Sequence, residues 1–189
     1  MFDKNRLKSI ISKFAQEFDV TADRSRTAYI KSLNGGDRLP AEGKLYGEDV
    51  RRQFAETARQ YGADAREIVD QRENEIRGLM AAAPSQDAVN ALTMLKMRNE
   101  VSEEELNGAF DAYGDNYQCY KVLADIAADN NIRGIDKHPL ETELEGLAVL
   151  KTSLARVFSV PGAESHTAGF YSMLEAQIDN VESNGGFFG

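Results

Sequence analysis

Residues 47–83 constrain this chain most, because they predict a single helix far longer than a globular helix needs to be. No proline interrupts the stretch before Pro84. At 1.5 Å per residue, such a helix is roughly 50 Å long. Its apolar and small residues recur mostly at steps of three and four, as on one helix face: Val50, Phe54, Ala58, Tyr61, Ala65, Ile68, Ile76 and Leu79. A helix of this length must lie against other helices or against a second copy of itself.

The residues before this stretch predict two shorter helices and a loop. Residues 2–18 have the pattern of an amphipathic helix, whose apolar face carries Leu7, Ile10, Ile11, Phe14 and Phe18. A second helix is expected after Thr21, a candidate N-cap, and is expected to end at the Asn-Gly-Gly of residues 34–36. Residues 34–46 contain Pro40 and several glycines, so we expect a hinge or a functional loop there.

After Pro84 the stop signals recur at short intervals, which predicts short helices. The clearest start is a capping box of Ser102 and Glu105, with Val101 and Leu106 placed as a hydrophobic staple. Other expected helix starts are Ser85, Asp115 or Asn116, Pro139 and Glu164. We find no strand pattern and no internal repeat. The sequence therefore predicts an all-α fold of about eight helices, with an N-terminal part over residues 1–83 and a compact helical domain over residues 85–189.

Charge is distributed unevenly along the 189 residues, whose net charge is −9. Residues 1–33 carry seven Lys or Arg against four Asp or Glu, whereas residues 100–189 carry five against sixteen. An acidic half of this kind attracts a basic partner or the basic end of a second copy, or it only keeps helix faces solvated. The short basic segment lacks the dense Lys and Arg, interleaved with aromatic residues, that binds phosphates. We therefore expect no direct binding to nucleic acid.

The cysteine content and the N-terminus both bear on the cellular compartment. Cys119 is the only cysteine, so no internal disulfide can form, which is typical of a reducing compartment. The chain opens with the charged residues Asp3, Lys4 and Arg6, and its apolar residues are spaced apart. This pattern is unlike a signal peptide or a membrane span. We expect a cytoplasmic protein that does not bind a membrane.

Residues 102–111 are similar to the helix that enters an EF-hand, but the likeness ends there. A loop counted from Gly114 places glycine where an aspartate ligand is needed and Cys119 where the turn glycine is needed. A loop counted from Asp129 places Leu140 where the bidentate glutamate is needed. Neither loop has the ligands for calcium, so we predict no metal site.

Signatures of catalysis and of cofactor binding are also lacking. His138 and His166 each lie near an expected helix start, where a histidine is usually a capping residue. The sequence contains no nucleophile and base at a recognisable spacing, and its thirty-one acidic residues indicate no particular pair of carboxylates. The glycines before Lys44 lack the spacing of a phosphate-binding loop. We therefore predict no catalytic residue and no cofactor.

We predict instead that apolar surfaces of this chain contact another protein or a second copy. The candidate contact residues are Leu7, Ile10, Phe14 and Phe18 near the N-terminus, Phe54, Tyr61 and Ile68 on the long helix, and Phe187 and Phe188 at the C-terminus. The first helix has an alternative, which is packing on the long helix within the same chain. The two terminal phenylalanines either dock on a neighbour or belong to a frayed tail. The helically spaced Met80, Met94, Met97 and Met173 are interpreted as core residues, with an adaptable binding groove as the alternative.

These observations favour a non-enzymatic structural or assembly protein that self-associates through helical surfaces. Its small size, acidity and helical character are typical of accessory proteins in bacteriophage assembly, and this comparison rests on composition alone. The alternative is an acidic helical adaptor or regulator that binds a basic or helical protein. A third class, an enzyme without a readable signature, would need a deep polar cleft.

Overall fold

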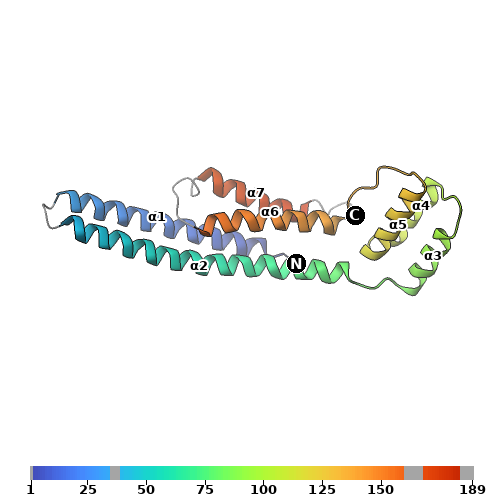
Figure 1. The fold of residues 1–189 in the computed structure, drawn as a ribbon, viewed down its shortest axis with the longest axis horizontal. Coiled ribbons are helices and arrows are strands. Elements are labelled where there is room, and N and C mark those ends of the chain that lie inside the picture. Colours follow the sequence, from blue (N-terminus) through green and yellow to red (C-terminus); the bar gives the residue numbers. More distant parts are fainter. Residues whose placement is uncertain (1, 35–38, 160–167, 184–189) are drawn as a thin grey trace. The chain divides into compact units, whose positions relative to one another are not determined.

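The computed structural model describes residues 2–34, 39–159 and 168–183, and over these residues the chain is all-helical, as predicted. Figure 1 shows the helices in chain order. The seven described helices are α1 (Lys4–Asn34), α2 (Leu39–Met80), α3 (Gln86–Lys96), α4 (Glu103–Tyr113), α5 (Tyr117–Asp129), α6 (Pro139–Ser159) and α7 (Ala168–Ser183). This agrees with the expected all-α class and is close to the expected eight helices.

The first two predicted helices form one continuous helix, α1, which accounts for the lower number. Thr21 lies inside α1 and does not cap a new helix. No glycine or proline occurs between residues 2 and 34, so nothing in the backbone of this segment forces a break. The long helix also begins earlier than predicted, at Leu39, because Pro40 occupies its first turn, where a missing N–H removes no helical hydrogen bond. Residues 39–46 of the expected loop are therefore helical, and residues 35–38 of it lie outside the described residues.

The chain divides into two compact units at positions other than the boundary expected near Pro84. Unit 1 comprises Met1–Gln71 and Gly146–Val181, and unit 2 comprises Arg72–Glu145 and Glu182–Gly189. Pro84 therefore lies inside unit 2. The last turns of α2 and the first turns of α6 belong to unit 2 together with α3, α4 and α5.

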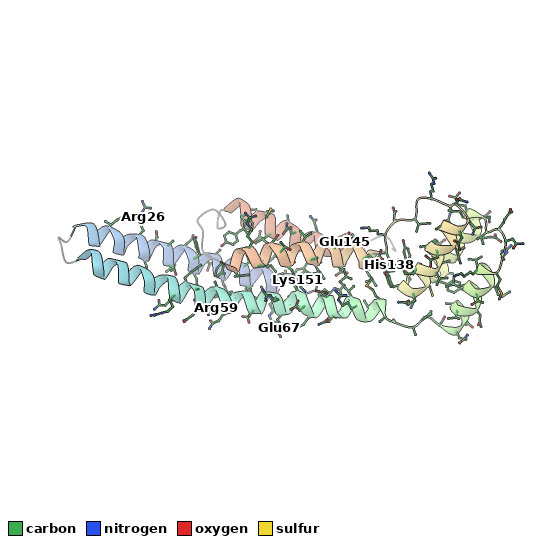
Figure 2. All side chains as sticks on the ribbon, viewed as in Figure 1. Arg26, Arg59, Glu67, His138, Glu145 and Lys151 are labelled. Atoms are coloured by element: carbon green, nitrogen blue, oxygen red, sulfur yellow. The ribbon has the colours of Figure 1, made fainter. Side chains whose placement is uncertain are left out.

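Unit 1 is a four-helix bundle in which neighbouring helices run antiparallel. α1 lies beside α2 and α7, and α6 lies beside α2 and α7 (Figure 1). The contacts that define this order are Glu17 with Tyr61, Asp70 with Lys151, Lys8 with Asp179, and Gly146 with Val181. Figure 2 labels Lys151, whose Nζ is 2.6 Å from Asp70 Oδ1. Each of the four helices can therefore turn its apolar stripe toward a shared interior.

An aromatic cluster around Phe14 fills one level of this interior. The Phe14 ring is fully buried, with centroid distances of 5.4 Å to Phe54 and 4.8 Å to Phe158. Such tilted and edge-on arrangements are favourable for aromatic pairs. Gly62 of α2 lies directly against Phe158 of α6, since a Cβ built at Gly62 would be 2.9 Å from Phe158 Cβ. The absence of a side chain at residue 62 therefore permits the close approach of α2 and α6.

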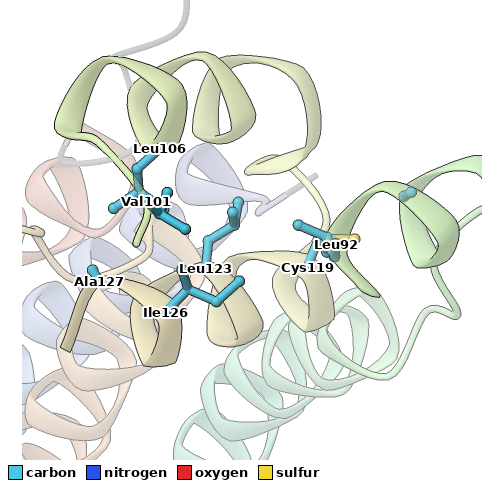
Figure 3. Packing of buried hydrophobic residues seen from close by; sticks show 8 residues of the cluster. Leu92, Val101, Leu106, Cys119, Leu123, Ile126 and Ala127 are labelled. Carbon is cyan, nitrogen blue, oxygen red and sulfur yellow. The ribbon is translucent and has the colours of Figure 1, made fainter. Parts of the chain in front are cut away.

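Unit 2 has its own core, shown in Figure 3, where α5 packs against both α3 and α4. The predicted helix starts in this unit are confirmed. Ser85 caps α3, Asn116 caps α5, and the reciprocal capping box of Ser102 and Glu105 opens α4. The buried core residues are Ala88, Leu92, Val101, Leu106, Cys119, Leu123, Ile126 and Ala127.

Polar contacts attach the parts of α2 and α6 that belong to unit 2. Arg72 donates to both carboxylate oxygens of Glu143, at 2.7 and 2.9 Å, which joins α2 to α6 through a half-buried, bidentate pair. The pair raises the pKa of the Arg72 guanidinium. Gln118 of α5 donates through Nε2 to the carbonyl oxygen of Met80 at 2.6 Å. These contacts hold the end of α2 and the start of α6 within unit 2.

Candidate functional site

The residues predicted to contact another molecule lie mainly in the core of unit 1, which corrects the expectation of an exposed contact face. Leu7, Ile10, Phe14, Phe54 and Ile68 are all buried in the single chain. The reason is that α6 and α7 supply matching apolar stripes to the bundle: Leu147, Leu150, Leu154, Leu174 and Ile178. The alternative of packing within the chain is the one that the structure shows.

Of the other predicted contact residues, two are half-buried and two lie outside the described residues. Phe18 is half-buried and meets Phe54 edge-on, with ring centroids 5.2 Å apart. Tyr61 is half-buried, and its hydroxyl donates to Glu17 Oε1 at 2.7 Å, a hydrogen bond that is the main cause of the raised Tyr61 pKa. Phe187 and Phe188 lie outside the described residues. None of these seven described side chains provides a large exposed apolar surface.

The two units differ sharply in charge. The residues of unit 1 carry fifteen Lys or Arg against fifteen Asp or Glu and are neutral in sum. Residues 72–145 of unit 2 carry seven Lys or Arg against fifteen Asp or Glu, a net charge of −8. Glu182, which also belongs to unit 2, supplies one further negative charge, so the whole net charge of the chain, −9, belongs to this one unit.

Unit 2 also exposes large apolar side chains on α3, and we call Val89, Met94 and Met97 the methionine face. Met94 is 71% exposed and Met97 is 80% exposed, so the interpretation of these two methionines as core residues is wrong. From α3, the core of unit 2 takes the buried Ala88 and Leu92 and the half-buried Leu95, which leaves the other side of this short helix to solvent.

Exposed carboxylates come from the same part of the chain as the methionine face. Asp87 lies in the first turn of α3, and Glu100, Glu103 and Glu104 follow the helix. All four are exposed. An apolar face that is flanked in the sequence by acidic residues has the composition that a basic amphipathic helix complements.

A cavity of about 390 Å³ lies in unit 2, and we call it the His138 pocket. Its lining includes Phe110 and Asp111 of α4, Tyr120 of α5, and Asp136 and His138 of the segment that leads into α6. This segment turns back toward α4 and α5 through two residues with left-handed backbone, Asn131 (φ 59°) and Gly134 (φ 89°). The cavity volume is within the range of about 300–1,000 Å³ that is usual for ligand sites.

His138 is buried at the start of α6, where Figure 2 labels it. Its Nδ1 accepts a hydrogen bond from the backbone N–H of Leu140 at 3.1 Å, so the predicted capping role of this histidine is confirmed. Burial lowers the pKa of His138, and the Gly114 carbonyl and the Glu141 carboxylate oppose this shift only in part. The imidazole is therefore neutral at pH 7.

Two tyrosines hold the imidazole in place. The ring centroids of Tyr117 and Tyr120 lie 5.3 and 4.9 Å from that of His138, both in edge-on geometry. The Tyr117 hydroxyl donates to Glu141 Oε1 at 2.7 Å, and this hydrogen bond is the main cause that raises the pKa of Tyr117 to about 12. The Tyr120 hydroxyl donates to the carbonyl oxygen of Asp136, and burial raises the pKa of Tyr120. Both phenols therefore stay neutral at pH 7.

The sequence alone does not predict this pocket. The apolar pattern places Phe110 and Tyr120 on the inner faces of two different helices, and Asp136 in a connecting segment. Only the packing of α4 on α5 and the return of the connecting segment bring these residues together. Asn131 and Gly134, residue types that tolerate left-handed backbone, were the local signals of a chain reversal.

Two further open cavities lie in unit 1. One, of about 710 Å³, lies between α1 and α2 and includes Glu17, Val20 and Tyr61 in its lining. The other, of about 320 Å³, lies between α2 and α6 near Arg66 and Lys151. Both are grooves between helices, and neither contains a buried titratable group.

Features that would support metal or thiol chemistry are not found in the described part of the chain. No group of three or more His, Cys, Asp or Glu side chains could hold a metal ion within the described residues. The first EF-hand-like loop does not exist as a loop, because α5 occupies most of it. Cys119 is buried, and burial raises the pKa of its thiol, which disfavours the reactive thiolate.

Comparisons of the chain with protein-family models, with curated proteins and with solved structures find no match. No helix among the described residues has both the length and the apolar character that crossing a membrane requires. The charge, the exposed side chains and the cavities of the two units therefore indicate what the chain can bind.

Proposed function

We propose that this chain is an acidic helical adaptor, and that unit 2 binds a basic, helical segment of another protein. The observation that carries the proposal is the division of charge, with −8 in residues 72–145 and a neutral unit 1. A charge excess confined to one unit creates a local field that attracts basic partners and repels acidic ones.

The methionine face supports the same proposal. Met94 and Met97 are largely exposed, although burying a methionine side chain is worth about 1.5–3 kcal/mol. Methionine is flexible and polarisable, and it is common on surfaces that adapt to helical partners. A basic amphipathic helix would cover these side chains with its apolar face and place its cations near the carboxylates of Asp87, Glu100 and Glu103.

The competing hypothesis, a structural protein that self-associates through its apolar helix faces, has less structural support. Phe54 and Ile68, on which it rested, are already covered inside unit 1. A contact through these residues would require the bundle to open, at the expense of the buried aromatic cluster. The adaptor needs no such rearrangement, because its proposed contact residues are exposed.

The adaptor is tested with a synthetic peptide of about eighteen residues that carries leucine on one helix face and arginine on the other. Binding to the full chain is measured by fluorescence anisotropy at about 50 and 300 mM NaCl. We expect saturable binding that weakens at the higher salt concentration, because exposed charge pairs are screened over about 8–10 Å at physiological ionic strength. Amide resonances of residues 72–145 should shift in NMR spectra.

Matched variants test the methionine face. Replacing both methionines, Met94→Gln and Met97→Gln, should weaken binding about tenfold. Met173→Gln, at an exposed methionine of unit 1, should change affinity less than about twofold. A peptide with glutamine in place of arginine should not bind. The proposal fails if both peptides bind alike, or if the shifted resonances belong to unit 1.

A further inference from the structure

The His138 pocket combines aromatic rings with carboxylates. Phe110 and Tyr120 are half-buried, meet edge-on with ring centroids 5.5 Å apart, and both line the cavity. The faces of aromatic rings attract cations, and the guanidinium of arginine is a more frequent partner than the ammonium of lysine. The rings therefore provide an apolar wall that can also hold a positive charge.

The carboxylates of the pocket add to this preference. Asp111 of α4 and Asp136 of the segment before α6 both line the cavity and are exposed to solvent. Because the two residues belong to different elements, a ligand in the cavity can contact a carboxylate from each of them. A planar guanidinium has five N–H donors and suits such a distribution of acceptors better than a compact ammonium.

The remaining titratable groups of the lining do not oppose a cation. His138 is neutral at pH 7, because burial lowers its pKa. Lys137 also lines the cavity, and its Nζ is 2.6 Å from Glu145 Oε1, so its charge is compensated by an ion pair. Glu141, which faces the same histidine, carries a negative charge and accepts the hydrogen bond of Tyr117. The electrostatic character of the pocket is therefore negative.

We propose that the His138 pocket binds an arginine side chain of the basic partner, held against the rings of Phe110 and Tyr120 and paired with Asp111 and Asp136. The inference rests on the proposed function and names the residue type by which the partner is recognised. The binding of a helix to the methionine face and the capture of one arginine in the pocket are separate contacts, so they are tested separately.

The probe is N-acetyl-arginine methylamide, titrated into the full chain and followed by NMR. N-acetyl-citrulline methylamide, which has the same shape and no charge, is the control. We expect saturable shifts with the arginine probe at the amides of Asp111, Gly114, Gly134 and Asp136, and none with the citrulline probe. Shifts spread evenly over the acidic residues of unit 2, without saturation, would overturn the pocket as a specific site.

Two exposed substitutions test the pocket without disturbing the core. The double variant Asp111→Asn and Asp136→Asn should weaken binding of the arginine probe about tenfold. The control Asp125→Asn, at an exposed acid of α5 that does not line the pocket, should leave the affinity within about twofold. Equal effects of the double variant and the control would overturn the inference. If the amphipathic peptide still binds unit 2 in that case, the adaptor stands and the arginine pocket alone is rejected.

Discussion

His138 shows how a single residue connects local structure with the pocket. The imidazole caps α6 through Nδ1, is packed between two tyrosine rings, and forms part of the cavity lining. Because burial is the main cause of its lowered pKa, the folded protein resists protonation of this residue more than the unfolded chain does. The residue therefore makes stability depend on pH.

We expect the stability contributed by neutral His138 to be present above pH 6.5, the ordinary pKa of histidine, and to be lost as pH falls toward the lower pKa of the folded state. His138→Asn keeps a side-chain oxygen that can cap α6 but does not titrate. The variant should be less stable than the wild type at pH 7.5, and the difference should shrink toward pH 5. Urea unfolding followed by circular dichroism at several pH values measures this. Parallel curves for the two proteins would contradict the lowered pKa.

At the scale of elements, the bundle of unit 1 depends on how closely α2 and α6 approach. The antiparallel helices α2 and α6 contact each other at Gly62 and Phe158, and the ring of Phe158 is part of the aromatic cluster around Phe14. A side chain at residue 62 would push against the Cβ of Phe158, which is fixed to the backbone of α6. The spacing of the two helices is therefore set at this glycine.

Gly62→Ala should destabilise the protein by about 1–3 kcal/mol, because the added Cβ would lie 2.9 Å from Phe158 Cβ. Gly108→Ala in α4 is the control, since nothing lies within 4 Å of the corresponding Cβ. The control should stabilise the protein by about 0.5–1 kcal/mol through helix propensity. Urea unfolding gives both free energies. A Gly62→Ala protein as stable as the control would mean that α2 and α6 are further apart than the structure shows.

At the scale of the whole molecule, a neutral helical bundle and an acidic helical unit are parts of one chain. The apolar residues of the bundle are used for folding, whereas the acidic unit keeps the methionine face exposed. Folding and the proposed partner binding therefore depend on different sets of residues. This separation predicts that core substitutions in unit 1 change stability and leave the mass of the protein in solution unchanged.

Phe54→Asp should reduce the stability of the fold by about 4 kcal/mol or more, because it places a charge in the core of unit 1. Val20→Asp, at a residue of α1 that is half exposed, should change stability by less than about 0.5 kcal/mol. Thermal melts compare the two variants, and sedimentation at several concentrations gives their masses. If Phe54→Asp instead leaves the melting temperature unchanged and lowers the mass, this face joins two chains. Self-association would then be the favoured function.

The sequence by itself determined most of the helical segments and where most of the helices of unit 2 begin, although residues 39–46, expected in a loop, belong to α2. Ser85, the pair of Ser102 and Glu105, and Asn116 act on backbone groups within one helical turn, so their effect is visible in the local sequence. Pro139 marks the start of α6 for the same reason. The break predicted near Thr21 was wrong, because a threonine that can cap a helix is also tolerated inside one.

Only the tertiary structure decided which apolar faces cover one another. Periodicity shows that Phe14 and Phe54 belong to buried faces, but it does not say whether the cover comes from this chain or from another. The answer depends on contacts such as Phe14 with Phe158, which join residues far apart in the sequence. The His138 pocket has the same origin, because Phe110, Tyr120 and Asp136 meet only after α4 and α5 have packed. Local hydrogen bonds can be predicted from neighbouring residues, whereas the partner of an apolar face is selected by the fit of the whole fold.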